Sequence, residues 1–194
     1  MRFRPFEDIK TRTPIDKAKL EEYAGYYKRI EVPAKTVLLR EGDISRKGFF
    51  IEKGCIRAWL NKNGKDISFQ FFFENEFVSS AESFRKNVPS VVTIETIEPC
   101  ILHQISKEKL NKVLREIMQV TELREFMVNA MFERQLNYMR HFISFIKETP
   151  QERYRNLLKE KPHIIHRVPQ QHVASYLGIT PVSLSRIKNK IRQD

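Results

Sequence analysis

The chain has 194 residues, enough for one large domain or two small ones, and 35 Lys and Arg against 24 Asp and Glu give a formal charge of +11. Nine of the basic residues and three of the acidic ones lie in 149–194, a density that suits a polyanionic partner as well as a solvated surface. Two cysteines exclude a disulfide framework, and no apolar run is long enough for a membrane span or a signal sequence. We therefore expect a cytoplasmic protein with no membrane partner.

A short helix precedes a β-rich segment. Asp16, after Thr13-Pro14, predicts a helix start, and this helix ends near Gly25. Across residues 26–105, runs rich in Val, Ile and Phe alternate with turn signals. The predicted strands are 36–40, 47–52, 55–61, 66–73, 91–97 and 100–105. Their near-regular spacing predicts a small barrel or sandwich, with a hairpin turn at Asn63-Gly64.

Phenylalanine is concentrated in one of these strands. Phe69, Phe71, Phe72 and Phe73 are followed closely by Phe77. Such a run can line an aromatic ligand pocket, or it can fill a barrel core and contact a helix packed on it. We favour the core and a contact to the long helix that follows.

Helical periodicity returns after residue 106, with one helix ending near Gln119 and a second running from Thr121, its possible cap, to about Glu148. A helix of about 27 residues spans about 40 Å, too long for one face of a small barrel. It has two apolar stripes, which indicates two partners, the barrel and a second subunit; the alternative is a helix covered within its own chain. The predicted dimer interface is Val120, Met127, Met131, Arg134, Tyr138 and Phe145. The second stripe is Leu123, Phe126, Ala130, Phe142 and Ile146.

A new helix is predicted after the long one. Thr149-Pro150-Gln151-Glu152 has the pattern of a capping box with proline at the first helical position. Lys161-Pro162 stops this helix, and a short segment at 163–167 leads into the pair of helices that follows. We place a domain boundary at residue 149.

The last quarter of the chain predicts two short helices joined by a tight turn. Pro169 suits the first turn of one helix, Gly178 suits the left-handed position that ends it, and Thr180-Pro181 suits the start of the next. The apolar side chains at helical spacing are Val173, Ala174, Leu177, Leu184, Ile187 and Ile191. The other side of the second helix carries Val182, Ser183, Ser185, Arg186 and Asn189. Because short polar groups and one guanidinium suit base edges, we expect a DNA-binding helix-turn-helix rather than an inert helical hairpin.

This order of elements resembles the Crp/Fnr family of bacterial transcription regulators. The resemblance is carried by Leu39–Asp43, Phe49–Gly54, Asn63–Lys65, and Ala174–Thr180 with Ser185-Arg186. It implies an α+β fold with three parts. These are an N-terminal β-roll (a jelly-roll-like barrel) that senses an effector at 1–119, a long dimerisation helix at 120–148, and a C-terminal all-helical or winged helix-turn-helix domain at 149–194.

The resemblance also implies a homodimer whose second helix-turn-helix helices enter successive major grooves, with RNA polymerase as a further partner. Arg186 matches a family position that often reads guanine, while Pro181 and Val182 stand where polar readers are common and favour a thymine methyl instead. Gln170 and Gln171 match positions near the DNA backbone. Phosphate contacts are expected from Thr180, Ser183, Arg167, Lys188, Lys190 and Arg192.

The predicted effector site departs from cyclic-nucleotide binders. Phe77-Val78 stands where these proteins have a Gly-Glu pair for the ribose, and Ser90-Val91 stands where they have Arg-Ser/Thr for the phosphate. Because a buried phosphate without a cationic partner is costly, we expect no tight binding of cyclic AMP. Weak candidates for a different pocket are Ser79, Ser80, Glu82, Arg85 and Ser90. We favour a surface loop for them.

The histidines favour neither a metal site nor catalysis. Only His103 lies in a predicted strand, so the barrel has no histidine pair for a metal. We expect His141 to be packed, and His163, His166 and His172 to be solvated or near phosphate. No cofactor is expected, and no nucleophile, base and acid stand at catalytic spacing.

We therefore expect a homodimeric, sequence-specific DNA-binding regulator on a near-palindromic site, controlled by a ligand other than cyclic AMP or by none. Two other classes stay open. One is a ligand-sensing module that acts through protein contacts, and the other is a cupin-like metalloenzyme.

Overall fold

A computed structural model describes residues 16–191 of the chain. The predictions on Thr13-Pro14 and on Arg192 lie outside these residues. Helix α2 (Lys17–Ala24) begins at Asp16, whose side chain accepts a hydrogen bond from the Ala18 amide, and ends at Gly25. The first predicted helix is therefore confirmed from Asp16 onward.

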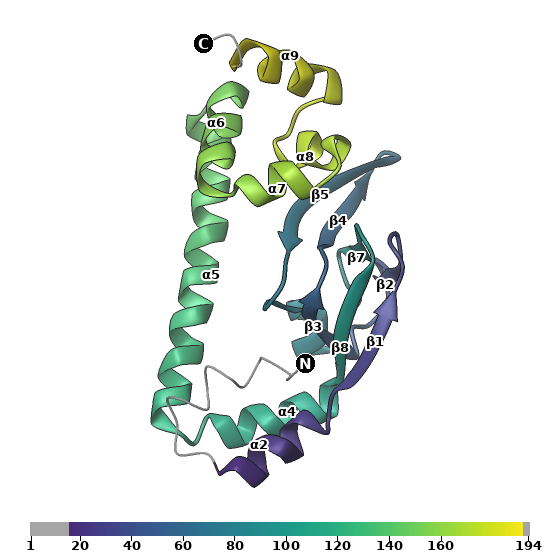
Figure 1. The fold of residues 1–194 in the computed structure, drawn as a ribbon, viewed down its shortest axis with the longest axis vertical. Helices are drawn as coiled ribbons and strands as arrows, with labels where there is room; N and C mark the ends of the chain where they lie inside the picture. The colour runs from purple at the N-terminus through teal and green to yellow at the C-terminus, as the bar shows by residue number, and fades with distance from the viewer. Residues whose placement is uncertain (1–15, 192–194) are drawn as a thin grey trace.

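Two four-stranded antiparallel sheets form a β-roll, as predicted (Figure 1). One sheet has the order β1-β8-β3-β6 and the other β2-β7-β4-β5. The strands are β1 (Lys28–Val32), β2 (Val37–Leu39), β3 (Lys47–Lys53), β4 (Ile56–Lys62), β5 (Lys65–Phe72), β6 (Phe77–Val78), β7 (Thr93–Thr96) and β8 (Cys100–Ser106). The six predicted strands are all present. Strands β1 and β6 were missed, because β1 alternates exposed charges with half-buried side chains and β6 has only two residues.

The core of the roll lies between the two sheets. Ile51, Ile56 and Leu102 are fully buried there. Strand β4 turns Ile56 and Ala58 into this core, so by strand periodicity Cys55 and Arg57 face the opposite side. At the tip of β4 and β5, Asn63-Gly64 has positive φ at both residues, which a tight hairpin turn requires.

Helices lie at both ends and along one side of the roll. They are α3 (Ala81–Lys86), α4 (Lys107–Ile117), α5 (Thr121–Lys147), α6 (Pro150–Glu160), α7 (Pro162–Arg167), α8 (Gln170–Tyr176) and α9 (Pro181–Ile191). Figure 1 shows α5 running the length of the molecule, with α2 and α4 at one end and α6 to α9 at the other. Thr121 is the first residue of α5 and does not cap it, since Val120 holds the cap position without a side-chain bond.

The C-terminal helices form as predicted, with one shift. Thr149 and Glu152 make both hydrogen bonds of the capping box at the start of α6. Pro169 is the cap of α8 and not its first helical residue. Residues 149–191 contain no strand, so the described part of this segment is all-helical. The domain division at residue 149 stays a prediction.

The phenylalanine run is shared between two cores. Phe72 packs inside the roll, with the Arg134 guanidinium of α5 over its ring, as the predicted core and helix contact require. Phe71 instead packs against Tyr176 of α8, and Phe73 packs edge-on against His163 of α7. The C-terminal helices therefore share a hydrophobic cluster with the outer face of β4 and β5, a contact that the sequence analysis did not predict.

Candidate nucleic-acid interface

The turn between α8 and α9 is built from local sequence. Gly178 has a φ of +70°, and the Ile179 amide bonds to the Ala174 carbonyl oxygen at 3.0 Å, which closes the end of α8. The Thr180 hydroxyl accepts a hydrogen bond from the Ser183 amide at 3.1 Å and so caps α9. Ala174 and Leu184 are fully buried where the two helices cross. The turn therefore fixes α9 relative to α8.

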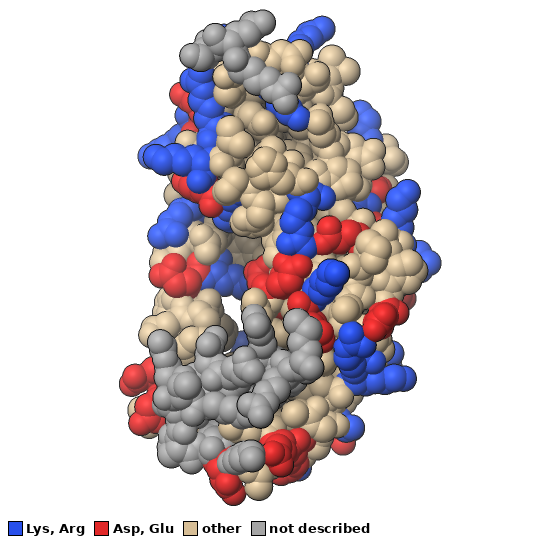
Figure 2. All heavy atoms as spheres, in the orientation of Figure 1, with Lys and Arg blue, Asp and Glu red and all other residues tan. Residues whose placement is uncertain are grey.

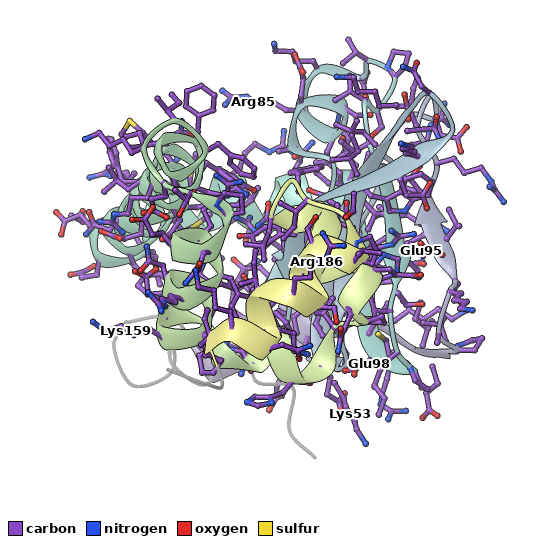
Figure 3. The ribbon with its side chains drawn as sticks, turned by 90° about the horizontal axis from the view of Figure 1, so that it is seen from above. Lys53, Arg85, Glu95, Glu98, Lys159 and Arg186 are labelled. Atoms are coloured by element: carbon purple, nitrogen blue, oxygen red, sulfur yellow. The ribbon has the colours of Figure 1, made fainter. Side chains whose placement is uncertain are left out.

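Helix α9 presents one face to solvent. Leu184 is buried and Ile187 is half-buried, whereas the opposite side is open. The exposed residues among the predicted contacts are Gln170, Gln171, Thr180, Pro181, Val182, Ser185, Arg186 and Asn189, and Ser183 and Lys188 are half-buried. Viewed from above α9, Arg186 lies on the side of the molecule toward the viewer (Figure 3). The exposed face of α9 is thus free to meet a macromolecule.

Hydroxyl groups at the start of α9 already have partners. The Thr180 and Ser183 oxygens are 2.9 Å apart, and the Ser183 amide is bonded to Thr180. The predicted phosphate contacts from these two side chains would therefore share groups that cap the helix. Their role in binding stays a prediction.

Arg167 corrects a prediction. Its guanidinium makes two hydrogen bonds of 2.7 Å to the Glu74 carboxylate, pairs with Glu98, and lies over the Phe73 ring. These bonds hold the pKa of Glu74 down to about 2. Arg167 therefore joins α7 to the roll and is not a free phosphate contact. The sequence could not show this, because Glu74 lies 93 residues away.

His172 corrects a second prediction. It is half-buried, with Nδ1 3.0 Å from an Nη1 atom of Arg57, rather than solvated. His141 is packed, as predicted, and stacks on Tyr176 with ring centroids 4.4 Å apart. Burial lowers the pKa of His141 to about 4. His163 and His166 are exposed on α7, although His163 also contacts Phe73.

The long helix leaves part of the predicted interface exposed, since Met131, Tyr138 and Phe145 are 60%, 39% and 40% exposed. Tyr138 bonds to Gln70 of β5, Arg134 contacts the Phe77 carbonyl oxygen, and Phe145 packs against Gly178. Val120 and Met127 join a cluster with α2 and α4. Of the predicted interface residues, all but Met131 thus contact their own chain. Leu123 of the second stripe is also buried in the cluster with α2.

A second apolar stripe on α5, offset by one residue from the predicted interface, is exposed to solvent; we call it the open stripe. Its members repeat at alternating spacings of four and three residues, as in one strand of a coiled coil. They are Val128, Phe132, Met139, Phe142 and Ile146, with Gln135 at the remaining position. Phe132, Phe142 and Ile146 are 65%, 66% and 69% exposed. This stripe is more exposed than the predicted interface, and it includes Phe142 and Ile146 of the second predicted set. The dimer interface itself stays a prediction.

The five effector candidates do not form one site. The buried Ser80 and Ser90 hydroxyls bond to each other at 2.9 Å, while Glu82 pairs with Lys86 and Arg85 is exposed. A hollow of about 500 Å³ beside Leu39, Phe49 and Ile94 is lined by none of the candidates. A role for these residues in binding an effector stays a prediction.

Phe77 is half-buried on β6, the edge strand of its sheet. Its ring lies against Gly48 so closely that a Cβ there would be 2.1 Å from Cζ.

Within residues 16–191, His, Cys, Asp and Glu side chains form no group of three that could hold a metal. In the same residues, no helix is both long and apolar enough to cross a membrane.

Solved structures share the whole arrangement. The regulator CLP of Xanthomonas campestris, titled c-di-GMP responsive, superposes with a TM-score of 0.70 at 20% identity, covering 92% of this chain and 93% of that one. FixK2 of Bradyrhizobium japonicum gives 0.71 at 15% identity, with 86% and 85% covered. A CooA mutant of Carboxydothermus hydrogenoformans gives 0.69 at 12% identity, with 97% and 84% covered. The chain has the Crp/Fnr fold.

Within this Crp/Fnr fold, residues 29–116 match the cyclic nucleotide-binding domain family. The match spans the roll and most of α4. No curated protein sequence matches the chain. The family match concerns the roll and does not extend to α9, where the candidate interface lies.

Proposed function

We propose that this chain is a homodimeric transcription regulator that binds DNA through the exposed face of α9. One observation carries the proposal: Arg186 and Val182 are exposed on a helix whose other face is buried against α8. A guanidinium can donate two hydrogen bonds to guanine, and an apolar group can contact the thymine methyl. The helix-turn-helix supplies the rigid support that such contacts need.

Charge supports this proposal. Among the ion pairs of residues 16–191, Arg186, Lys188 and Lys190 take no part, in contrast to Arg167. Figure 2 shows Lys and Arg side chains along the upper left flank, where α5 and α6 lie. Unpaired basic groups near α9 can neutralise phosphates, so binding should weaken steeply as the salt concentration rises.

The open stripe on α5 supports a homodimer. Exposed Phe, Met and Ile at coiled-coil spacing need a cover, and a second copy presents the same stripe across a two-fold axis. Two α9 helices related in this way would lie in major grooves about 34 Å apart. The DNA site should therefore be nearly palindromic.

The effector is proposed to be different from cyclic AMP, or absent. The Phe77 ring lies against Gly48, and Ser90, which matches the position of a phosphate-binding arginine in cyclic-nucleotide binders, bonds to Ser80 instead. A sensing module that acts only through protein contacts is the second candidate. It is favoured by the open α5 stripe alone, and it requires no duplex binding. RNA polymerase as a partner and a cytoplasmic location follow only from the proposed role.

Selection from a random duplex library tests the proposal. We expect the full-length protein to enrich one half-site repeated with two-fold symmetry. The Arg186→Ala variant should lose discrimination at one base pair in each half-site, whereas Lys188→Ala should weaken all duplexes alike. If no sequence is enriched and no salt-dependent duplex binding is seen, the protein-contact module is the better explanation.

A further inference from the structure

The helix-turn-helix is held against the β4–β5 hairpin by Ser175 of α8. The Ser68 amide donates to the Ser175 hydroxyl at 2.8 Å, and that hydroxyl donates to the Asp66 carbonyl oxygen at 3.1 Å. The pairing of β4 with β5 shifts register beside this contact, between Ala58 and Trp59. One serine thus bonds α8 to the backbone of the hairpin.

Arg57 forms a second contact between the roll and α8. Its side chain faces away from the roll core yet is only 5% exposed, because α8 covers it. Glu95 accepts hydrogen bonds of 2.9 and 2.6 Å from its Nε and Nη2 atoms, and Asp66 accepts one of 3.1 Å. The remaining nitrogen, Nη1, lies 3.0 Å from Nδ1 of His172.

The chemistry of this contact fixes the charge of His172. A guanidinium has only donors and keeps its proton at all relevant pH values, so Nδ1 of His172 must be the acceptor. An imidazole that accepts a hydrogen bond at Nδ1 is neutral. Protonation at Nδ1 would remove the acceptor and place two cations in contact. The contact between α8 and the roll therefore requires neutral His172.

The charged groups around His172 have opposite effects on its pKa. Arg57 and Lys35 disfavour the imidazolium, and Glu95 and Asp66 favour it. Burial, followed by Arg57, outweighs the carboxylates and lowers the pKa of His172 below its ordinary value. On another side of α8, His141 stacks on Tyr176 and takes up a proton only near pH 4. His172 is thus the group on α8 that titrates against Arg57.

We propose that His172 is a proton-operated latch, which holds the helix-turn-helix on the β4–β5 hairpin while neutral and releases it on protonation. In the released state His172 regains an ordinary pKa near 6.5. Docking is therefore fully favoured above pH 6.5 and weakens as the pH falls below it, by up to tenfold per pH unit until the lower docked pKa is reached. Because α9 is fixed to α8, release would also reorient Arg186. The latch does not depend on whether the chain binds DNA.

Amide hydrogen exchange of the full chain tests the latch, with the Ser68 amide as the reporter. After correction for intrinsic exchange, we expect protection of this amide to fall several-fold, up to about eightfold, between pH 7.0 and 5.5. In the His172→Gln variant the amide oxygen can still accept from Arg57 but cannot take up a proton. In this variant the protection of the Ser68 amide should change by less than about twofold over the same range. His166→Gln, at an exposed position of α7, should keep the wild-type response.

Two further measurements keep the proposal testable if His172→Gln does not fold. Ser175→Ala should lower the protection of the Ser68 amide at every pH, because it removes the hydroxyl that accepts the hydrogen bond of this amide. Proton NMR of the wild-type imidazoles should give His172 a midpoint below 6.5 that coincides with the change at the Ser68 amide. A His172 midpoint at or above 6.5, or an unchanged pH response in His172→Gln, would overturn the latch.

Discussion

Replacing Phe142 by alanine should dissociate the proposed dimer without harming the fold of the subunit. Phe142 is 66% exposed in the C-terminal half of the open stripe on α5. An aromatic side chain can bury about 200 Å², so about 130 Å² is available here, or about 3 kcal/mol per subunit at ~25 cal/mol per Å². Alanine keeps one carbon, and burial at an interface is incomplete, so we expect a net loss of about 2–4 kcal/mol per dimer.

That loss corresponds to a rise in the dimer dissociation constant of about 30- to 1000-fold, since about 1.4 kcal/mol is tenfold. Sedimentation equilibrium over a range of concentrations measures it directly. Phe145→Ala is the matched control, because the Phe145 ring packs against Gly178 and under Arg153 of its own chain. It should lower the unfolding midpoint and leave the dimer constant nearly unchanged. The opposite result, with Phe145→Ala dissociating the dimer and Phe142→Ala not, would refute the assignment of the two stripes.

Three other perturbations address separate parts of the molecule. Arg186→Ala should cost about 1–3 kcal/mol on the selected site and relax specificity at one base pair, and equal weakening on all sequences in a competition assay would make Arg186 a phosphate contact. Gly178→Ala should destabilise the protein by about 1–3 kcal/mol in urea, because φ is +70° and the new Cβ would lie 2.7 Å from Phe145. An unchanged midpoint would contradict the close approach. Titration calorimetry should show no micromolar binding of cyclic AMP. Heat that saturates in that range would contradict the prediction that the roll does not bind cyclic AMP tightly.

Local patterns in the sequence were enough for the elements and their order. The capping box at Thr149, the glycine at 178 and the hairpin at Asn63-Gly64 each act within a few residues, so the chain determines them without distant partners. Runs rich in Val, Ile and Phe, separated by turn signals, predicted six strands of the roll. The exposed side of α9 follows equally from helical spacing around Leu184.

Only the tertiary structure decided which groups meet across the molecule. The predicted interface on α5 and the neighbouring open stripe differ by a rotation of about one residue, and packing on the roll and on α8 makes the second the more exposed of the two. In the sequence nothing distinguishes Arg57, Arg167 and His172 from other polar residues, because their partners lie far along the chain. Helix and turn formation depends on neighbours in sequence, whereas these contacts depend on how the completed elements pack. Local patterns in a single sequence do not reveal that packing.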